Sequence, residues 1–172
     1  MARLVALLRG VNLGAKRRVP MADLRSLMAE LGYEDVRTVL QSGNVVFTGA
    51  KAKAQATLET ALAERYPFAV DVVLRTMDEL RAVSDHDPFK DEADDLTRSF
   101  VVFLPGKPNA QRLAELEGED WSPDHFRAHG RELYAWCPEG MQGSRLMKAL
   151  GKPGIAPTAT FRNMSTIRKL LE

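Results

Sequence analysis

Residues 4–20 read LVALLRGVNLGAKRRVP, and this stretch decides how the chain begins to fold. Its first five residues, Leu4 to Leu8, are apolar at consecutive positions, which is typical of a central, buried strand. Pro20 favours the start of a helix, because its fixed φ and missing N–H suit the first helical position. The segment between them contains two glycines, an asparagine and several cations. Because ligand-binding groups commonly lie in loops of this kind, the segment is a candidate site.

The elements that follow predict a β-α-β-β-α-β order across residues 3–75. Apolar residues at helical spacing predict a helix after Pro20 that ends at Gly32, and a second helix over about 52–66. Further strands are expected at 36–40, 45–47 and 70–74. The glycine and asparagine of residues 42–44 favour a hairpin between the first two of these. This order is the split βαβ pattern of ferredoxin-like folds.

The second half of the chain repeats the element order more weakly. Strands are expected near 100–104, 126–129, 132–136 and 158–162, and helices near 113–116, 146–150 and 163–171. The fold class is therefore predicted as α/β (α+β), with two tandem ferredoxin-like βαββαβ units and a C-terminal helix. The predicted domains are 1–76 and 99–172. A capping-box helix starting at Thr76 and an acidic connector fill residues 77–98.

This topology predicts that two polar segments lie together. In a β-α-β-β-α-β unit, the loop that leaves the first strand and the hairpin between the second and third strands lie at the same end of the sheet. Arginine, lysine, carboxamides and free backbone N–H groups suit an anion. We expect Arg9 and Lys16 to hold a phosphate or carboxylate, and Asn12, Gln41 and Asn44 to orient it. The complete set of predicted ligand-binding residues in these segments is Arg9, Gly10, Asn12, Gly14, Lys16, Gln41, Ser42 and Asn44. Tight turning and local hydrogen bonding are the alternative explanation for the same residues.

Composition bounds the compartment and the class of partner. The 172 residues are 45% apolar and carry a formal net charge of +1, whereas general nucleic-acid-binding proteins are usually more basic. The one cysteine, Cys137, excludes a disulfide within the chain. No apolar segment approaches the roughly 20 residues that cross a bilayer, and a strand begins almost at Met1, which leaves no room for a secretory signal. We therefore expect a cytoplasmic protein with no membrane partner and an unknown oligomeric state.

Motifs for cofactors and metals are weak in this chain. Gly10, Gly14 and Lys16 have the wrong spacing for a phosphate-binding P-loop, and the G-x-G-x-x-G dinucleotide fingerprint does not occur. His125 and His129 are four residues apart, but a solvated strand face explains them better than a metal site. The sequence thus predicts no cofactor and no metal, and Cys137 favours a small buried role over a nucleophilic one.

Specific motifs carry a resemblance to a known family. Residues 7–14 (LLRGVNLG), the later Met21-x-x-Leu24, and residues 40–47 (LQSGNVVF) resemble domain of unknown function 1697, a family of small bacterial proteins. The closing Thr160-Phe161-Arg162-Asn163-x-x-Thr166 is similar to the tail motif of that family, although Met164 stands where the family usually has tryptophan. The resemblance implies a two-part protein with ferredoxin-like halves and no established reaction. It adds Arg162 and Asn163 to the ligand-binding candidates, as members of the site or as a cap of the last helix.

Two other functions stay open from the sequence. The first is binding of RNA or single-stranded nucleic acid through an exposed sheet face and the Lys16-Arg17-Arg18 run, although Phe47 is the only aromatic residue in the first-half strands. The second is a protein interaction module without a ligand. A small anionic ligand remains the leading hypothesis, and whether any reaction is catalysed is open because the cluster contains no obvious base or nucleophile.

Overall fold

The computed structural model describes residues 1–172, which form two compact units. Unit 1 comprises Met1–Ala82 with Lys169–Glu172, and unit 2 comprises Val83–Arg168. The elements up to residue 86 are β1 (Ala2–Leu8), α1 (Met21–Glu30), β2 (Glu34–Val39), β3 (Asn44–Gly49), α2 (Ala54–Arg65), β4 (Val72–Thr76) and α3 (Met77–His86). They are followed by a short 3-10 helix (Leu96–Arg98), β5 (Ser99–Phe103), α4 (Ala110–Glu117), β6 (His125–His129), β7 (Glu132–Trp136), α5 (Arg145–Leu150), β8 (Thr160–Asn163) and α6 (Met164–Leu171). The domain limits 1–76, 77–98 and 99–172 remain a prediction about independently folding parts.

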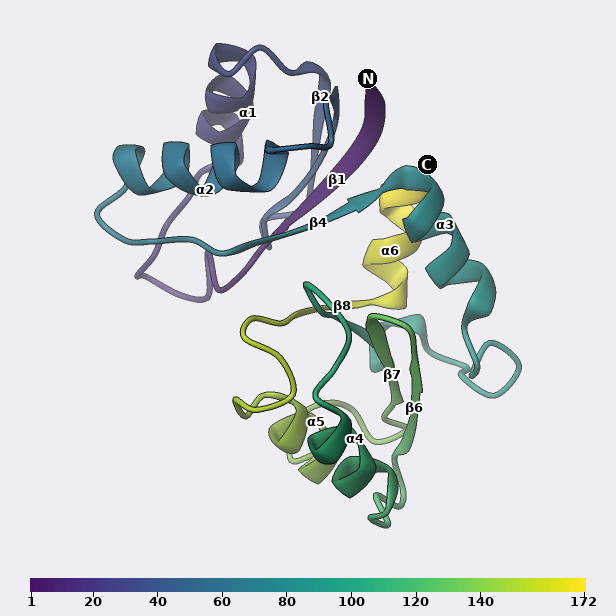
Figure 1. Ribbon diagram of the computed structural model, residues 1–172. Helices are drawn as coiled ribbons and strands as arrows, with labels where there is room; N and C mark the ends of the chain where they lie inside the picture. The colour runs from purple at the N-terminus through teal and green to yellow at the C-terminus, as the bar shows by residue number, and fades with distance from the viewer. The chain divides into compact units, whose positions relative to one another are not determined.

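Each unit is built on one four-stranded antiparallel sheet. The strand orders are β2-β3-β1-β4 in unit 1 and β6-β7-β5-β8 in unit 2, so the same topology occurs twice. In each unit two helices lie together beside the sheet, α1 and α2 in the first and α4 and α5 in the second (Figure 1). The predicted fold class, two tandem ferredoxin-like units with a C-terminal helix, is confirmed.

Alternation along β1 explains how its unit forms a core. Leu4, Ala6 and Leu8 pack with buried residues of α1 and α2, such as Leu24 and Leu58. The intervening residues are also buried, so β1 is covered on both faces. The consecutive apolar residues of this strand are therefore a direct consequence of burial on two sides. An exposed sheet face, which RNA modules of this topology use for base stacking, is absent at β1.

Local signals mark several element ends as predicted. The Thr76 hydroxyl accepts a hydrogen bond from the Glu79 N–H (3.0 Å), and the Glu79 carboxylate accepts one from the Thr76 N–H (2.7 Å), which completes the capping box before α3. Gly32 has the predicted left-handed conformation after α1, with φ +84°. Pro20 differs from the prediction: its backbone is extended (ψ 136°), so it precedes α1 and Met21 is the first helical residue.

The sheet register of unit 1 decides where the polar segments lie. β1 runs antiparallel to both β3 and β4, with Leu7 opposite Asn44 and Leu8 opposite Val72. The end of β1, the start of β3 and the start of β4 therefore meet at one end of the sheet.

No helix in the structure is both long and apolar enough for a membrane span.

Candidate functional site

Three segments meet at this end of the unit 1 sheet, and we call the surface that they form the rim: loop 9–19, hairpin 40–43 and segment 66–71. The Leu8 N–H donates to the Gly43 carbonyl (2.8 Å), and the Arg9 N–H donates to the Asp71 carbonyl (2.9 Å). A hydrogen bond from the Asn12 amide to the Gln41 carbonyl joins the loop to the hairpin, which confirms the predicted convergence of the two segments.

Asn12 fastens loop 9–19 to the hairpin. Its side-chain oxygen accepts from the Val19 N–H (2.8 Å), and its amide nitrogen donates to the Val19 carbonyl (2.9 Å) and the Gln41 carbonyl (2.6 Å). The residue adopts φ +57°, a left-handed conformation that asparagine tolerates better than most side chains. Both amide hydrogens are thus used inside the protein. Asn12 fixes the loop, and it has no remaining donor with which to orient a ligand.

Asn44 and Gly43 shape the hairpin in a similar way. Asn44 is fully buried, and its amide nitrogen donates to the Val39 carbonyl and the Ser42 hydroxyl, each at 2.8 Å. Gly43 has φ +86°, and a Cβ atom there would lie 2.8 Å from side-chain atoms of Leu8 and Val11. Only glycine fits without displacement of these atoms. Asn44 and Gly43 therefore position the backbone of the rim, while Gln41 is exposed.

The rim is strongly cationic. Arg9, Lys16, Arg17 and Arg18 are all exposed residues, and Asp71 is the single acidic residue in the three segments. Arg9 lies 3.7 Å from the Asp71 carboxylate, and the two side chains are 51% and 48% exposed. Such a half-exposed pair neutralises little of the charge because water screens it. Arg18 donates to the Gly14 carbonyl at 3.3 Å. The geometry presents cations on a backbone that internal hydrogen bonds hold in place.

Two large apolar side chains are exposed on the same rim. Leu13 is 82% exposed at the tip of loop 9–19, and Leu40 is 48% exposed in the hairpin. Leu40 also has φ +59°, an unfavourable conformation for a leucine. Neither residue was singled out from the sequence, because exposure and backbone strain are not visible in a hydrophobic pattern.

Arg162 and Asn163 belong to unit 2. The Asn163 side chain accepts a hydrogen bond from the Thr166 N–H (2.9 Å) and so caps α6. A cap of the last helix was one of the two roles predicted for this residue. Arg162 is buried, and it donates to the Thr160 hydroxyl (2.8 Å) and the Phe161 carbonyl (2.7 Å). Burial lowers the pKa of its guanidinium to about 10. Both side chains thus make local contacts around the end of β8.

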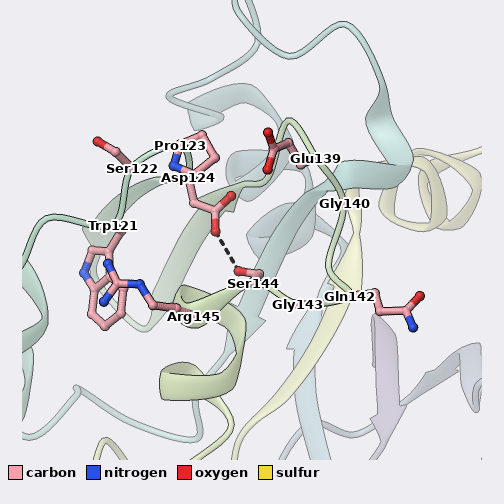
Figure 2. Close-up of a pocket in the computed structure, with 10 residues that line it drawn as sticks. All are labelled: Trp121, Ser122, Pro123, Asp124, Glu139, Gly140, Gln142, Gly143, Ser144 and Arg145. Atoms are coloured by element: carbon pink, nitrogen blue, oxygen red, sulfur yellow. Dashed lines mark hydrogen bonds between the residues drawn. The ribbon is translucent and has the colours of Figure 1, made fainter.

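A pocket of about 130 Å³ lies in unit 2, between residues 121–124 and residues 139–145 (Figure 2). The Ser144 hydroxyl donates to the Asp124 carboxylate (2.7 Å) and accepts from the Met147 N–H (3.0 Å), which caps α5. The Arg145 guanidinium lies 5.5 Å from the centre of the Trp121 ring. Sequence reasoning missed this pocket, because two loops that are remote in sequence form it.

The family model described as "Protein of unknown function (DUF1697)" matches residues 1–134. The chain belongs to this family. It is also similar to a solved structure described as that of the conserved bacterial protein SP0830 from Streptococcus pneumoniae. The sequence identity is 30%, the TM-score is 0.79, and the match covers 99% of this chain and 96% of the other. No curated protein matches the chain.

In this member of the family, the groups near the pocket are poorly suited to nucleophilic attack. Cys137 is buried, and its Sγ lies 3.8 Å from the Ser144 hydroxyl. Burial raises the pKa of the thiol to about 11, so the thiol is protonated at neutral pH. The hydroxyl of Ser144 is hydrogen-bonded to a carboxylate and to a backbone N–H, and no histidine lines the pocket.

The two histidines four residues apart lie on β6 as expected for a strand. His125 and His129 are exposed, and Phe126 between them is buried. The His129 ring stacks on His86, with ring centroids 3.7 Å apart. No group of three or more histidine, cysteine, aspartate or glutamate side chains is arranged to hold a metal ion.

Proposed function

We propose that the rim of unit 1 binds a small anionic ligand that carries a phosphate or a carboxylate. Arg9 and Lys16 hold the anion, the exposed Gln41 side chain orients it, and the backbone N–H groups near Gly10 and Gly14 supply further donors. Asn12, Ser42 and Asn44 act as positioning residues, because their side-chain contacts fix the loop and the hairpin.

The observation that carries this proposal is the set of hydrogen bonds made by Asn12. They tie residue 12 to residues 19 and 41, so the cations on loop 9–19 project from a fixed backbone. A fixed cluster of cations binds an anion at a smaller entropic cost than a mobile loop does. The four cations of this loop also repel one another, and a bound anion would relieve that repulsion.

The ligand would be a cytoplasmic one. Cys137 is a free thiol in the folded protein, which fits a reducing compartment. The related structure is that of a bacterial protein, and we extend that source to this chain as part of the proposal.

Isothermal titration calorimetry with inorganic pyrophosphate and with citrate tests the proposal. Wild type, Arg9→Ala and Lys16→Ala are compared, and Arg81→Ala is the matched control, because Arg81 is 54% exposed and pairs with Asp78 as Arg9 pairs with Asp71. Loss of one charged hydrogen bond should weaken binding about tenfold in the two rim variants. Equal affinity of all four proteins for both anions would show that the rim is not the site.

A further inference from the structure

The guanidinium of Arg17 is held by three contacts on the rim. Its Nε donates to the Gly10 carbonyl (2.9 Å), and its Nη2 donates to the Ala69 carbonyl (2.8 Å). These acceptors lie on two different segments, so the plane of the guanidinium is fixed in two places. Its Cζ lies over the ring of Phe68, 4.9 Å from the ring centre.

Phe68 is in turn held by other side chains. Its ring stacks on Tyr66, with centroids 5.6 Å apart and an angle of 19° between the planes. The Tyr66 hydroxyl donates to the Asp23 carboxylate. Burial, followed by this hydrogen bond, raises the pKa of Tyr66, so the hydroxyl keeps its proton under all ordinary conditions. Tyr66 and Asp23 therefore support the Phe68 ring beneath Arg17, and the Tyr66 hydroxyl stays protonated near neutral pH.

Arg17 remains an exposed residue although three contacts hold it. The residue also has φ +54°, a conformation that non-glycine residues seldom adopt. Strained residues that the surroundings hold in place cluster at ligand-binding positions. A planar cation that is held in place and still exposed is a surface on which a planar ring can stack.

We infer that the anion bound at the rim is a nucleoside phosphate, whose base stacks on the Arg17 guanidinium while Lys16 and Arg9 contact the phosphate. This inference rests on the proposed function, since it names the ligand class of the same site. Bases stack on arginine planes in nucleic-acid-binding proteins, and stacking tolerates every base. The ligand is a free nucleotide or a nucleotide within a single strand, because both present the same base and phosphate.

Calorimetry with adenosine 5′-monophosphate and with ribose 5-phosphate tests base stacking on Arg17 separately from anion binding at the rim. The two ligands differ only in the base, so wild type should bind the nucleotide at least about fivefold more tightly. Arg17→Lys keeps the charge and removes the plane, so it should bind both ligands with nearly equal affinity. Arg98→Lys is the control, because Arg98 is 47% exposed and also donates to a backbone carbonyl (2.7 Å). It should keep the wild-type preference.

Wild-type binding of ribose 5-phosphate with no preference for the nucleotide would overturn this inference and leave the proposed function intact. Failure to bind ribose 5-phosphate, adenosine 5′-monophosphate and pyrophosphate alike would overturn both. Phe68→Leu gives a second test if Arg17→Lys does not fold, since loss of the supporting ring should also reduce the preference. A single-stranded hexanucleotide identifies the source: tighter binding than the mononucleotide indicates a strand, and equal binding indicates a free nucleotide. Both results support the stacking claim.

Discussion

The two units share one topology, but their matching sheet ends are built differently. In unit 1 the connection from β1 to α1 spans residues 9–20, and in unit 2 the connection from β5 to α4 spans only residues 104–109. The longer connection has four cations, and the shorter one has Lys107 alone. Hairpin contacts are conserved in form, since Leu8 donates to Gly43 and Leu104 donates to Arg131. The shared topology therefore brings the connection and the hairpin together in both units, and the longer connection of unit 1 adds the cations.

The largest expected effect is a difference in stability between alanine substitutions at the two hairpin glycines. Gly43→Ala forces a Cβ to within 2.8 Å of Leu8 and Val11 at φ +86°, whereas Gly130 has φ +60° and no atom within 4 Å of an added Cβ. We expect Gly43→Ala to lower the free energy of unfolding by about 3 kcal/mol and Gly130→Ala by about 1 kcal/mol. Urea unfolding measures both. Equal losses would mean that the hairpin of unit 1 is no more tightly packed than that of unit 2.

The next effect concerns the residue that follows the third strand of each unit. Cys137 follows β7, whereas Ala50, the residue that follows β3, has no titratable group. Because burial raises the pKa of the thiol from 9.0 to about 11, folding favours the protonated form. The resulting stability is complete below pH 9 and is lost as the pH rises to about 11.

This pH dependence predicts a difference of about 2 kcal/mol. Between pH 9 and pH 11, the free energy of unfolding of wild type should fall by that much more than the free energy of unfolding of Cys137→Ala, because the variant has no thiol. Urea titrations at four pH values give the free energy of unfolding of each protein. Comparing how this free energy changes with pH removes the constant cost of the cavity left by alanine. Parallel pH profiles for the two proteins would contradict a buried thiol in unit 2.

The sequence predicted this fold well because each decisive signal is local. Consecutive apolar residues at 4–8, the capping pair Thr76 and Glu79, and Gly43 each act within a few residues. The meeting of loop and hairpin then follows from strand order alone. The roles of individual side chains do not follow in this way. The hydrogen bond from the Asn12 amide to the Gln41 carbonyl joins residues 29 positions apart, and its geometry depends on the finished hairpin.

Other parts of the site were outside the reach of sequence for the same reason. The sequence places Arg17 only in the basic run 16–18, yet the structure fixes it against Ala69 and Phe68, because β4 begins beside the end of β1. The unit 2 pocket likewise needs the loops at 121–124 and 139–145 to be placed together. A pattern of residue types carries no information on such distances, which only the packed tertiary structure determines.

A smaller effect compares the asparagines of the two matching connections. Asn12 makes three side-chain hydrogen bonds, whereas Asn109 makes a single capping bond to the Arg112 N–H (2.9 Å). Asn12→Gly keeps the left-handed backbone accessible and should lower stability by about 2 kcal/mol. Asn109→Gly should cost only a few tenths of a kcal/mol, because glycine is a tolerated cap. Hydrogen exchange at the Val19 N–H should also accelerate in Asn12→Gly, and unchanged exchange there would contradict the role of Asn12 as the fastener of the loop.

The smallest effect on stability is expected where the largest effect on binding is proposed. Arg9→Ala removes a half-exposed ion pair at 3.7 Å, and such pairs contribute about 1 kcal/mol or less to folding. The free energy of unfolding of Arg9→Ala should therefore match that of Arg81→Ala, while only Arg9→Ala weakens pyrophosphate binding. A loss of 2 kcal/mol or more in Arg9→Ala would mean that this arginine is a structural element of the rim. The longer connection of unit 1 would then serve to hold the backbone of the rim, and the cations on it would not be its reason.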